Sequence, residues 1–111
     1  MVQAILWDMD GVLVDSGEAH HNAWKLLYAE RGQQITYEDF AATFGMANPY
    51  IIRRWLGQDT PDEVVAAVAA RKEQIYRTQV QSHVHLLPGV RDWLERFRRS
   101  GYRQAVASSG E

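Results

Sequence analysis

One stretch organises this sequence: residues 4–16, which read AILWDMDGVLVDS. Its apolar run, residues 4–7, predicts a short buried strand, and Asp8 and Asp10 follow at alternate positions that point to one side of an extended chain. Two carboxylates this close repel each other unless a cation or a shared proton lies between them. Gly11 then lets the backbone turn tightly and brings N–H groups toward an anion. Together these features predict a phosphoryl-transfer site at the end of a strand.

The alternative interpretation of the same residues is a plain turn. Asp and Gly are among the commonest turn residues, so an isolated Asp-x-Asp-Gly indicates little by itself. Here an apolar strand precedes the pattern, and hydrophobic residues 12–14 and the helix-capping pair Asp15-Ser16 follow it. These surroundings favour the chemical interpretation.

The string DMDGVLVDS, residues 8–16, resembles the first motif of the haloacid dehalogenase superfamily of phosphatases and phosphomutases. The resemblance implies that Asp8 is the nucleophile and Asp10 the general acid/base, with Mg²⁺ bound by both carboxylates and Gly11 close to the phosphate. It also implies an α/β fold: a partial Rossmann-like core of parallel strands, residues 1–15 and 84–111, with an α-helical cap inserted at residues 16–83.

Composition narrows the class of protein. The net charge is −2 without a basic block, which argues against a nucleic-acid partner. The absence of cysteine excludes a disulfide framework and a thiolate metal site. No apolar run approaches the roughly 18 residues that indicate a membrane span, and residues 1–8 lack the features of a signal peptide. We therefore expect a cytoplasmic protein that does not bind membranes.

The first part of the expected cap is a helix from Glu18 to Arg31, with Gly32 as its stop. Its apolar stripe comprises Ala19, Ala23, Trp24, Leu26 and Leu27. The adjacent histidines His20 and His21 must point to different sides, one toward a cleft and the other toward water, although a polar surface pair explains them as well. Glu18, His20, Ala23, Trp24 and Lys25 match a run typical of the β-phosphoglucomutase branch of the family. That match implies that His20 orients or hinges the site beside the catalytic aspartates.

Further helices are expected between residues 36 and 82. Capping patterns are present at Thr36–Asp39, at Asn48-Pro49 and at Thr60-Pro61, the last with Glu63 as a capping box. A final helix from about Pro61 to Gln81 carries Val64, Val68 and Ile75 on one face. Such a bundle would form a lid that excludes water and contacts the substrate.

Two features of the expected cap are candidates for substrate contact. The turn at residues 44–49 occupies the place of the family's specificity loop, although an ordinary inter-helix turn explains it equally well. A mutase of the β-phosphoglucomutase type would carry an arginine in this loop, whereas the nearest here are Arg53 and Arg54. This difference favours a phosphatase. Lys72 matches a lysine of the same branch, with a solvated helix charge as the alternative.

The chain returns to the core at residues 86–90, LLPGV, which resemble the segment that leaves the cap in this family. A helix from Val90 to Ser100 is expected to bury Val90, Trp93, Leu94 and Phe97 against the sheet. A parallel strand, residues 103–107, follows, and Ser108 and Ser109 stand at its end. Ser108 resembles the family's second motif, a hydroxyl that binds the transferring phosphoryl group; a simple Ser-Ser-Gly turn is the alternative.

The resemblance also implies a charge-balancing lysine and a later acidic pair, neither of which we find in these 111 residues. We therefore expect a chain that corresponds to about half of a family member and is catalytically incomplete alone. Its open sheet edge favours self-association.

Two classes of function remain open. The first is a Mg²⁺-dependent phosphatase for a small phosphorylated metabolite, such as a sugar phosphate or a phosphoglycolate-like acid, that forms an aspartyl-phosphate; a phosphomutase is the alternative enzyme. The second is a non-catalytic module that binds phosphate or a partner chain.

Overall fold

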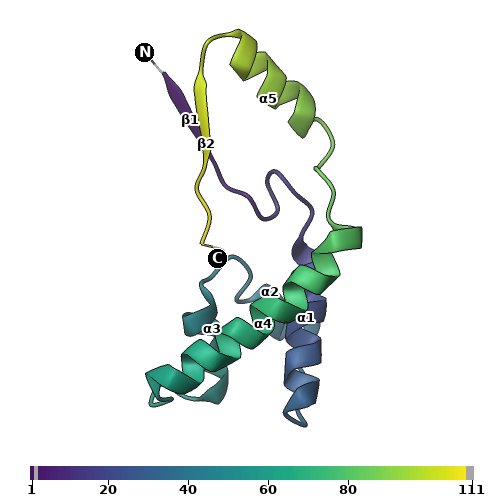
Figure 1. The fold of residues 1–111 in the computed structure, drawn as a ribbon, viewed down its shortest axis with the longest axis vertical. Helices are drawn as coiled ribbons and strands as arrows, with labels where there is room; N and C mark the ends of the chain where they lie inside the picture. Colours follow the sequence, from purple (N-terminus) through teal and green to yellow (C-terminus); the bar gives the residue numbers. More distant parts are fainter. Residues whose placement is uncertain (2, 110–111) are drawn as a thin grey trace.

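The computed structural model describes residues 1 and 3–109, except for the side chains of residues 82 and 83. The elements, in chain order, are β1 (Ala4–Trp7), α1 (Gly17–Glu30), α2 (Tyr37–Ala41), α3 (Asn48–Leu56), α4 (Asp62–His83), α5 (Val90–Arg99) and β2 (Arg103–Val106). Figure 1 shows them in two parts: β1, α5 and β2 at one end, and α1 to α4 at the other. We call these parts the α/β unit and the helical unit.

The α/β unit is built on two parallel strands. Ala4 of β1 pairs with Arg103 of β2, and the register continues to Trp7 and Val106. α5 connects back to this sheet through Trp7, whose ring lies 5.9 Å from that of Phe97. The Trp7 indole also donates a hydrogen bond of 2.9 Å to the Gln104 side chain. The predicted α/β class with parallel strands is confirmed.

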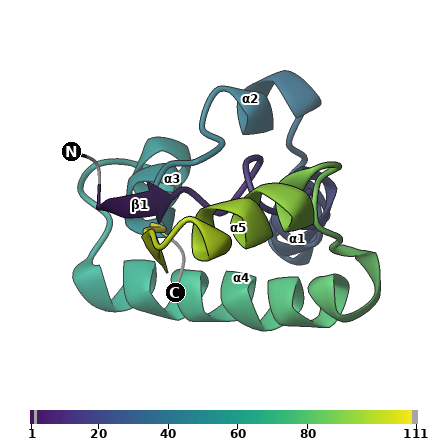
Figure 2. The same cartoon turned by 90° about the horizontal axis from the view of Figure 1, so that it is seen from above.

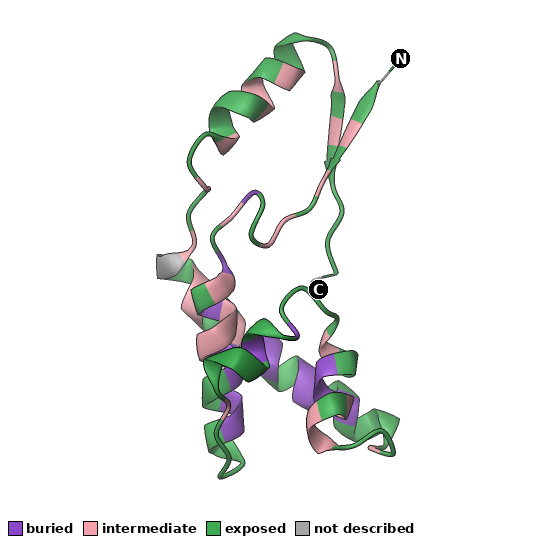
Figure 3. Cartoon of the chain, turned by 180° about the vertical axis from the view of Figure 1, so that it is seen from behind, coloured by how far each residue is buried: buried purple, intermediate pink, exposed green. Residues whose placement is uncertain are grey.

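The prediction of a buried first strand is wrong for the part of the chain that is described. Leu6 is 73% exposed and Val106 is 56% exposed, because two strands and one helix cannot cover both faces of a sheet. α5 likewise has no buried residue, and Trp93 of its predicted buried stripe is half exposed. Figure 3 shows buried residues gathered in the helical unit, while the strands and α5 are exposed or intermediate.

The helical unit contains the hydrophobic core. In Figure 2, α4 runs along one side of this unit, with α1 and α3 beside it. Trp24 and Leu27 of α1, Ile52 of α3 and Val68 of α4 are at most 2% exposed. Burying large apolar side chains stabilises by roughly 1.5–3 kcal/mol each, so α1, α3 and α4 hold together through this cluster.

Several predicted helix details change in the structure. Leu26 and Val64 were expected on buried faces but are exposed, and Val65 takes the buried place beside Val68. The helical period decides this: positions 65, 68, 69 and 72 lie on one side of α4.

The helix ends agree with prediction only in part. Thr36 forms the predicted capping box with Asp39 at the start of α2. Asn48 and Thr60 do not cap α3 and α4, which begin with no side-chain cap; Thr60 instead donates to the Gly57 carbonyl at 2.7 Å. In the described part of the chain, no helix is both long and apolar enough to cross a membrane.

Candidate active site

Asp8 stands at the end of β1 on an exposed turn. Its Oδ1 accepts a hydrogen bond of 2.9 Å from the backbone N–H of Met9. The chain then turns sharply, because Gly11 has φ +75° and its N–H donates to the Val14 carbonyl at 2.9 Å. That positive φ is easy for glycine and strained for other residues.

Asp10 is held more firmly than Asp8. Two donors meet its Oδ1: the Ser16 hydroxyl, from a side chain with no exposed surface, and the Nε2 of His20 at 3.2 Å. Ser16 precedes α1 and His20 lies on its first turns, so the start of this helix fixes the carboxylate.

His20 connects the loop between β1 and α1, residues 8–16, which we call the aspartate loop, to α4. Lys72 Nζ lies 3.0 Å from His20 Nδ1, and an ammonium group can only donate, so Nδ1 accepts. The ring proton therefore sits on Nε2 and is donated to Asp10. The His20 ring also stacks on Tyr76, with centroids 4.0 Å apart and planes 8° from parallel. Burial and the Lys72 charge lower the pKa of His20, which keeps the imidazole neutral.

Lys72 is buried, so the alternative of a solvated helix charge is wrong. It is 2% exposed, donates to Glu73 Oε1 at 2.9 Å and lies over the Tyr76 ring at 4.7 Å. The Asn48 amide also donates to Glu73 Oε1, at 2.7 Å. Burial opposes ionisation, but the hydrogen bonds from Lys72 and Asn48 hold the pKa of Glu73 below its usual value. We call Asp10, His20, Lys72 and Glu73 the buried polar network.

His21 is only partly exposed, so the prediction that the second histidine meets water holds in part. Its ring stacks on Phe40 at 4.8 Å and meets Tyr37 edge-on at 5.3 Å. Its Nε2 is buried without a hydrogen-bond partner among the described residues. Burial lowers the pKa of His21, in keeping with a neutral ring under the aromatic residues of α2.

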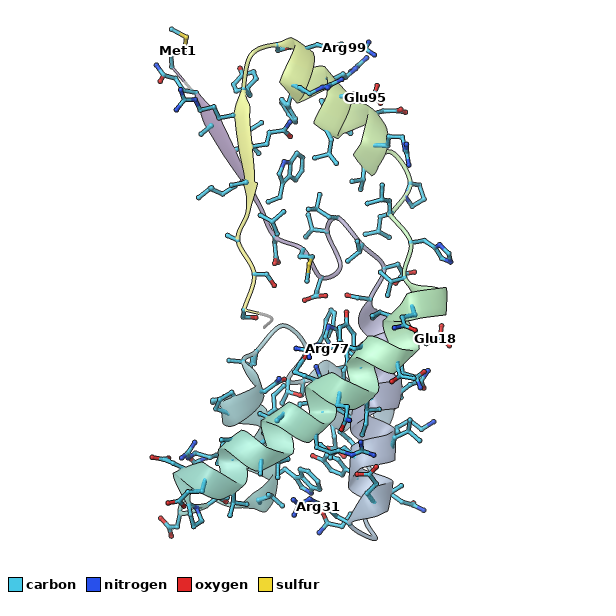
Figure 4. The ribbon with its side chains drawn as sticks, viewed as in Figure 1. Met1, Glu18, Arg31, Arg77, Glu95 and Arg99 are labelled. Atoms are coloured by element: carbon cyan, nitrogen blue, oxygen red, sulfur yellow. The ribbon has the colours of Figure 1, made fainter. Side chains whose placement is uncertain are left out.

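A cavity lies between the aspartate loop and the helical unit, bounded by Asp10, His20, Lys72, Phe44 and Met46. Phe44 reaches the aspartate loop, since a Cβ at Gly11 would lie 3.6 Å from its ring. Figure 4 shows Arg77 on α4 of the helical unit, while Glu95 and Arg99 lie on α5 at the other end.

The end of β2 also approaches the helical unit. The Ser109 hydroxyl donates to the Gly45 carbonyl at 3.2 Å, so its proton is directed to the loop after α2. Ser108 is exposed in the same segment. The structure thus joins Asp10, His20 and Lys72 directly, and brings Ser109 to the cavity from the other side.

Sequence reasoning missed the partners of this network. Ser16 was expected only as a helix cap, yet its hydroxyl binds Asp10 and makes no cap hydrogen bond. Glu73 was not predicted as a site residue, and Asn48 was predicted only as part of the turn at residues 44–49. The contact between Lys72 and Tyr76 could have been predicted from the sequence, because the two residues are four positions apart and therefore lie on one face of a helix.

The acidic loop suits Mg²⁺ in the type of its donors. Carboxylate oxygens are the ligands that Mg²⁺ prefers, and the ion commonly keeps several waters beside one or two carboxylates. Asp8 is exposed and Asp10 has one oxygen committed to Ser16 and His20. The described residues offer no cluster of three His, Cys, Asp or Glu side chains.

A parallel α/β fold with paired carboxylates after its first strand defines the class of this protein, a hydrolase of the haloacid dehalogenase type. The family model for haloacid dehalogenase-like hydrolases matches residues 2–111, and the chain belongs to this family.

Individual relatives agree with this family. The chain is 30% identical to a phosphoglycolate phosphatase of Rhodobacter capsulatus, covering 98% of this chain and 51% of that protein. It also resembles a CbbY mutant from Rhodobacter sphaeroides in complex with xylulose-(1,5)bisphosphate, with TM-score 0.82, 25% identity and coverage of 96% and 51%. β-Phosphoglucomutase from Clostridium difficile shares the fold, with TM-score 0.84, 22% identity and coverage of 97% and 52%. The chain spans about half the length of the curated CbbY and phosphoglycolate phosphatase proteins that it matches.

Proposed function

We propose that this chain carries the nucleophile and the general acid/base of a phosphatase that acts on a small phosphorylated metabolite. The observation that carries the proposal is the pairing of an exposed carboxylate, Asp8, with one held by Ser16 and His20, Asp10. A nucleophile must be free to reach phosphorus, whereas an acid/base must be held in position.

Each step can be written for these two residues. An Asp8 carboxylate oxygen attacks phosphorus, the bond from phosphorus to the substrate oxygen breaks, and Asp10 gives its proton to that leaving oxygen. Water then attacks the aspartyl-phosphate, Asp10 takes the water proton, and inorganic phosphate leaves while Asp8 is restored. One group thus serves as acid and then as base.

The neutral His20 suits the second role of Asp10. Its Nε2–H stabilises the carboxylate through a hydrogen bond without adding a full positive charge. Gly11 and Ser108 are the proposed phosphate contacts, through the backbone N–H and the hydroxyl respectively. Ser109 is proposed as a further contact from the same segment, although its hydroxyl is directed to Gly45.

The helical unit is proposed as the cap, residues 16–83, and residues 1–15 and 84–111 as the core. Phe44 against Gly11 and Ser109 against Gly45 support this, because they bring the two units together around one cavity. Such contact excludes water from the reacting groups.

Asp8 and Asp10 are proposed to hold Mg²⁺. When bound, this ion offsets the negative charge that the carboxylates and the phosphate bring together.

A phosphatase is favoured over a phosphomutase by the arginines. Arg53 binds the Asp62 carboxylate, and Arg54 lines a separate groove beside Trp55. No arginine lies among the described residues that line the cavity, so no guanidinium is placed to hold a second phosphate.

Trapping of the aspartyl-phosphate tests the proposal. The chain is incubated with Mg²⁺ and acetyl phosphate or p-nitrophenyl phosphate, reduced with borohydride, and mapped by mass spectrometry for homoserine at position 8. Asp8→Asn should lose the product, while Asp15→Asn, which changes an exposed carboxylate of the same segment, should keep it. Labelling at another residue, or phosphate binding without a labelled aspartate, would contradict the proposal; the second result would support a non-catalytic phosphate-binding module.

A further inference from the structure

The charge of the cavity restricts what can enter it. Three charged residues are found among the described residues that line it: Asp10, Lys72 and Glu73. Lys72 and Glu73 form an ion pair whose charges cancel, and Asp10 belongs to the proposed Mg²⁺ site; His20 is neutral because its Nδ1 accepts from Lys72. A ligand anion other than the reacting phosphate therefore finds no net positive charge in this wall.

The single cation of this lining is already committed. Lys72 donates to Glu73 at 2.9 Å and to His20 at 3.0 Å, and 98% of its surface is covered (it is 2% exposed). Turning this ammonium toward a ligand would leave the buried Glu73 carboxylate without its charge partner, which is costly.

Asn48, another polar donor of this lining, and the nearby cations are also engaged elsewhere. Asn48 uses its amide to donate to Glu73 at 2.7 Å. Arg53 binds Asp62, and Arg71 binds Glu30 on the outside of the helical unit. Arg77, labelled on α4 in Figure 4, is exposed and is not among the residues that line the cavity.

Most of the remaining wall is apolar or aromatic; the Ser109 hydroxyl, which also lines it, donates to the Gly45 carbonyl at 3.2 Å. Phe40, Phe44, Met46 and Ile51 face the cavity from α2, α3 and the loop between them. These side chains favour carbon–hydrogen surface and neutral groups over a carboxylate or a second phosphate, because an unpaired charge loses its hydration there.

We propose that the substrate of this site is a phosphate monoester whose remaining part is uncharged, such as a neutral polyol or sugar monophosphate, and that carboxylated phosphates and bisphosphates are excluded. This rests on the proposed function. It separates the chain from relatives whose names specify phosphoglycolate or whose structure holds a bisphosphate.

A matched ligand pair tests this. 2-Hydroxyethyl phosphate and 2-phosphoglycolate have nearly the same size and differ in a hydroxymethyl against a carboxylate group. Their dissociation constants for the chain are measured by calorimetry with Mg²⁺ at low ionic strength, where charge effects are largest. We expect the neutral ester to bind about tenfold more tightly, the scale of an unfavourable charge contact of about 1.4 kcal/mol.

A substitution at Met46 should reduce this preference for the neutral ester. Met46 lines the cavity and is 45% exposed, so a longer side chain has room there. Met46→Arg should cut the preference about tenfold by strengthening phosphoglycolate binding, and Met46→Gln should leave it unchanged. Xylulose 5-phosphate should likewise bind the wild type more tightly than xylulose 1,5-bisphosphate does.

The two proposals fail in different ways. Equal or tighter binding of phosphoglycolate by the wild type, or the same change in Met46→Arg and Met46→Gln, would overturn the neutral-substrate inference while trapping at Asp8 still stands. Binding of neither ester, together with no label at Asp8, would overturn the proposed function and with it this inference.

Discussion

Replacing Lys72 by methionine removes the one ion-pair partner that Glu73, a buried carboxylate, has among the described residues. In the wild type, Glu73 receives 2.9 Å and 2.7 Å hydrogen bonds from Lys72 and Asn48, and neither Lys72 nor Glu73 is exposed by more than 6%. Methionine has a similar length and can pack beside the Trp24 and Tyr76 rings, although it loses the cation–π contacts that the Lys72 ammonium makes with them. The loss is therefore mainly electrostatic, and breaking a buried pair by removing one partner costs about 3–5 kcal/mol.

Urea unfolding followed by tryptophan fluorescence measures this change in the free energy of unfolding. The double variant Lys72→Met/Glu73→Gln should recover more than half of the loss, because a neutral amide at position 73 still accepts from Asn48 and no longer needs a cation. Arg71→Met is the matched control: its ion pair with Glu30 is on the surface of the same helix, so stability should stay close to wild type. Additive losses in the double variant would refute the view of Lys72 and Glu73 as a coupled pair.

Three further predictions concern the aspartate loop and its partners. Because the pKa of His20 is lowered in the folded state, the unfolded state binds a proton at this residue at a higher pH than the folded state does. The free energy of unfolding should therefore fall as pH drops below 6.5, and His20→Asn should make this fall less steep in urea titrations. An unchanged slope in His20→Asn would contradict this prediction. Gly11→Ala should cost about 1–2 kcal/mol because φ is +75°, whereas Gly17→Ala, in α1, should be nearly neutral; equal losses would argue against strain at Gly11. Wherever turnover is measurable, Asp10→Asn should lower it by about 10²–10⁴-fold, and a near-normal rate would remove the acid/base role.

The sequence predicted element types better than element environments. The apolar run at residues 4–7 and Gly32 gave β1 and α1 nearly at their observed bounds, and the Thr36 capping box gave the start of α2, because these signals are local. The prediction that β1 and one face of α5 are buried was wrong. Burial depends on which other elements cover a face, and the residue pattern within one strand or helix does not tell which elements those are.

For the candidate site, the aspartates and His20 could be predicted from the sequence, but the contacts that hold His20 could not. Its contact with Lys72 joins residues 52 positions apart, and no periodicity within one helix indicates such a pairing. Ser16 was misassigned because a serine before a helix ordinarily caps it, and here a nearby carboxylate competes for the same hydroxyl.

The buried polar network links the chemistry of Asp10 to the packing of the helical unit. Asp10 Oδ1 depends on Ser16 and His20, His20 is held by Lys72 and Tyr76, and both of these lie on α4. A change in how α4 packs on α1 would therefore move the His20 ring and weaken one of the two donors to Asp10. An acid/base must lie within hydrogen-bond reach of the proton that it transfers, and small misplacements cost large factors in rate. Residues of the α1–α4 interface that never touch a substrate should thus affect turnover through the position of a single carboxylate.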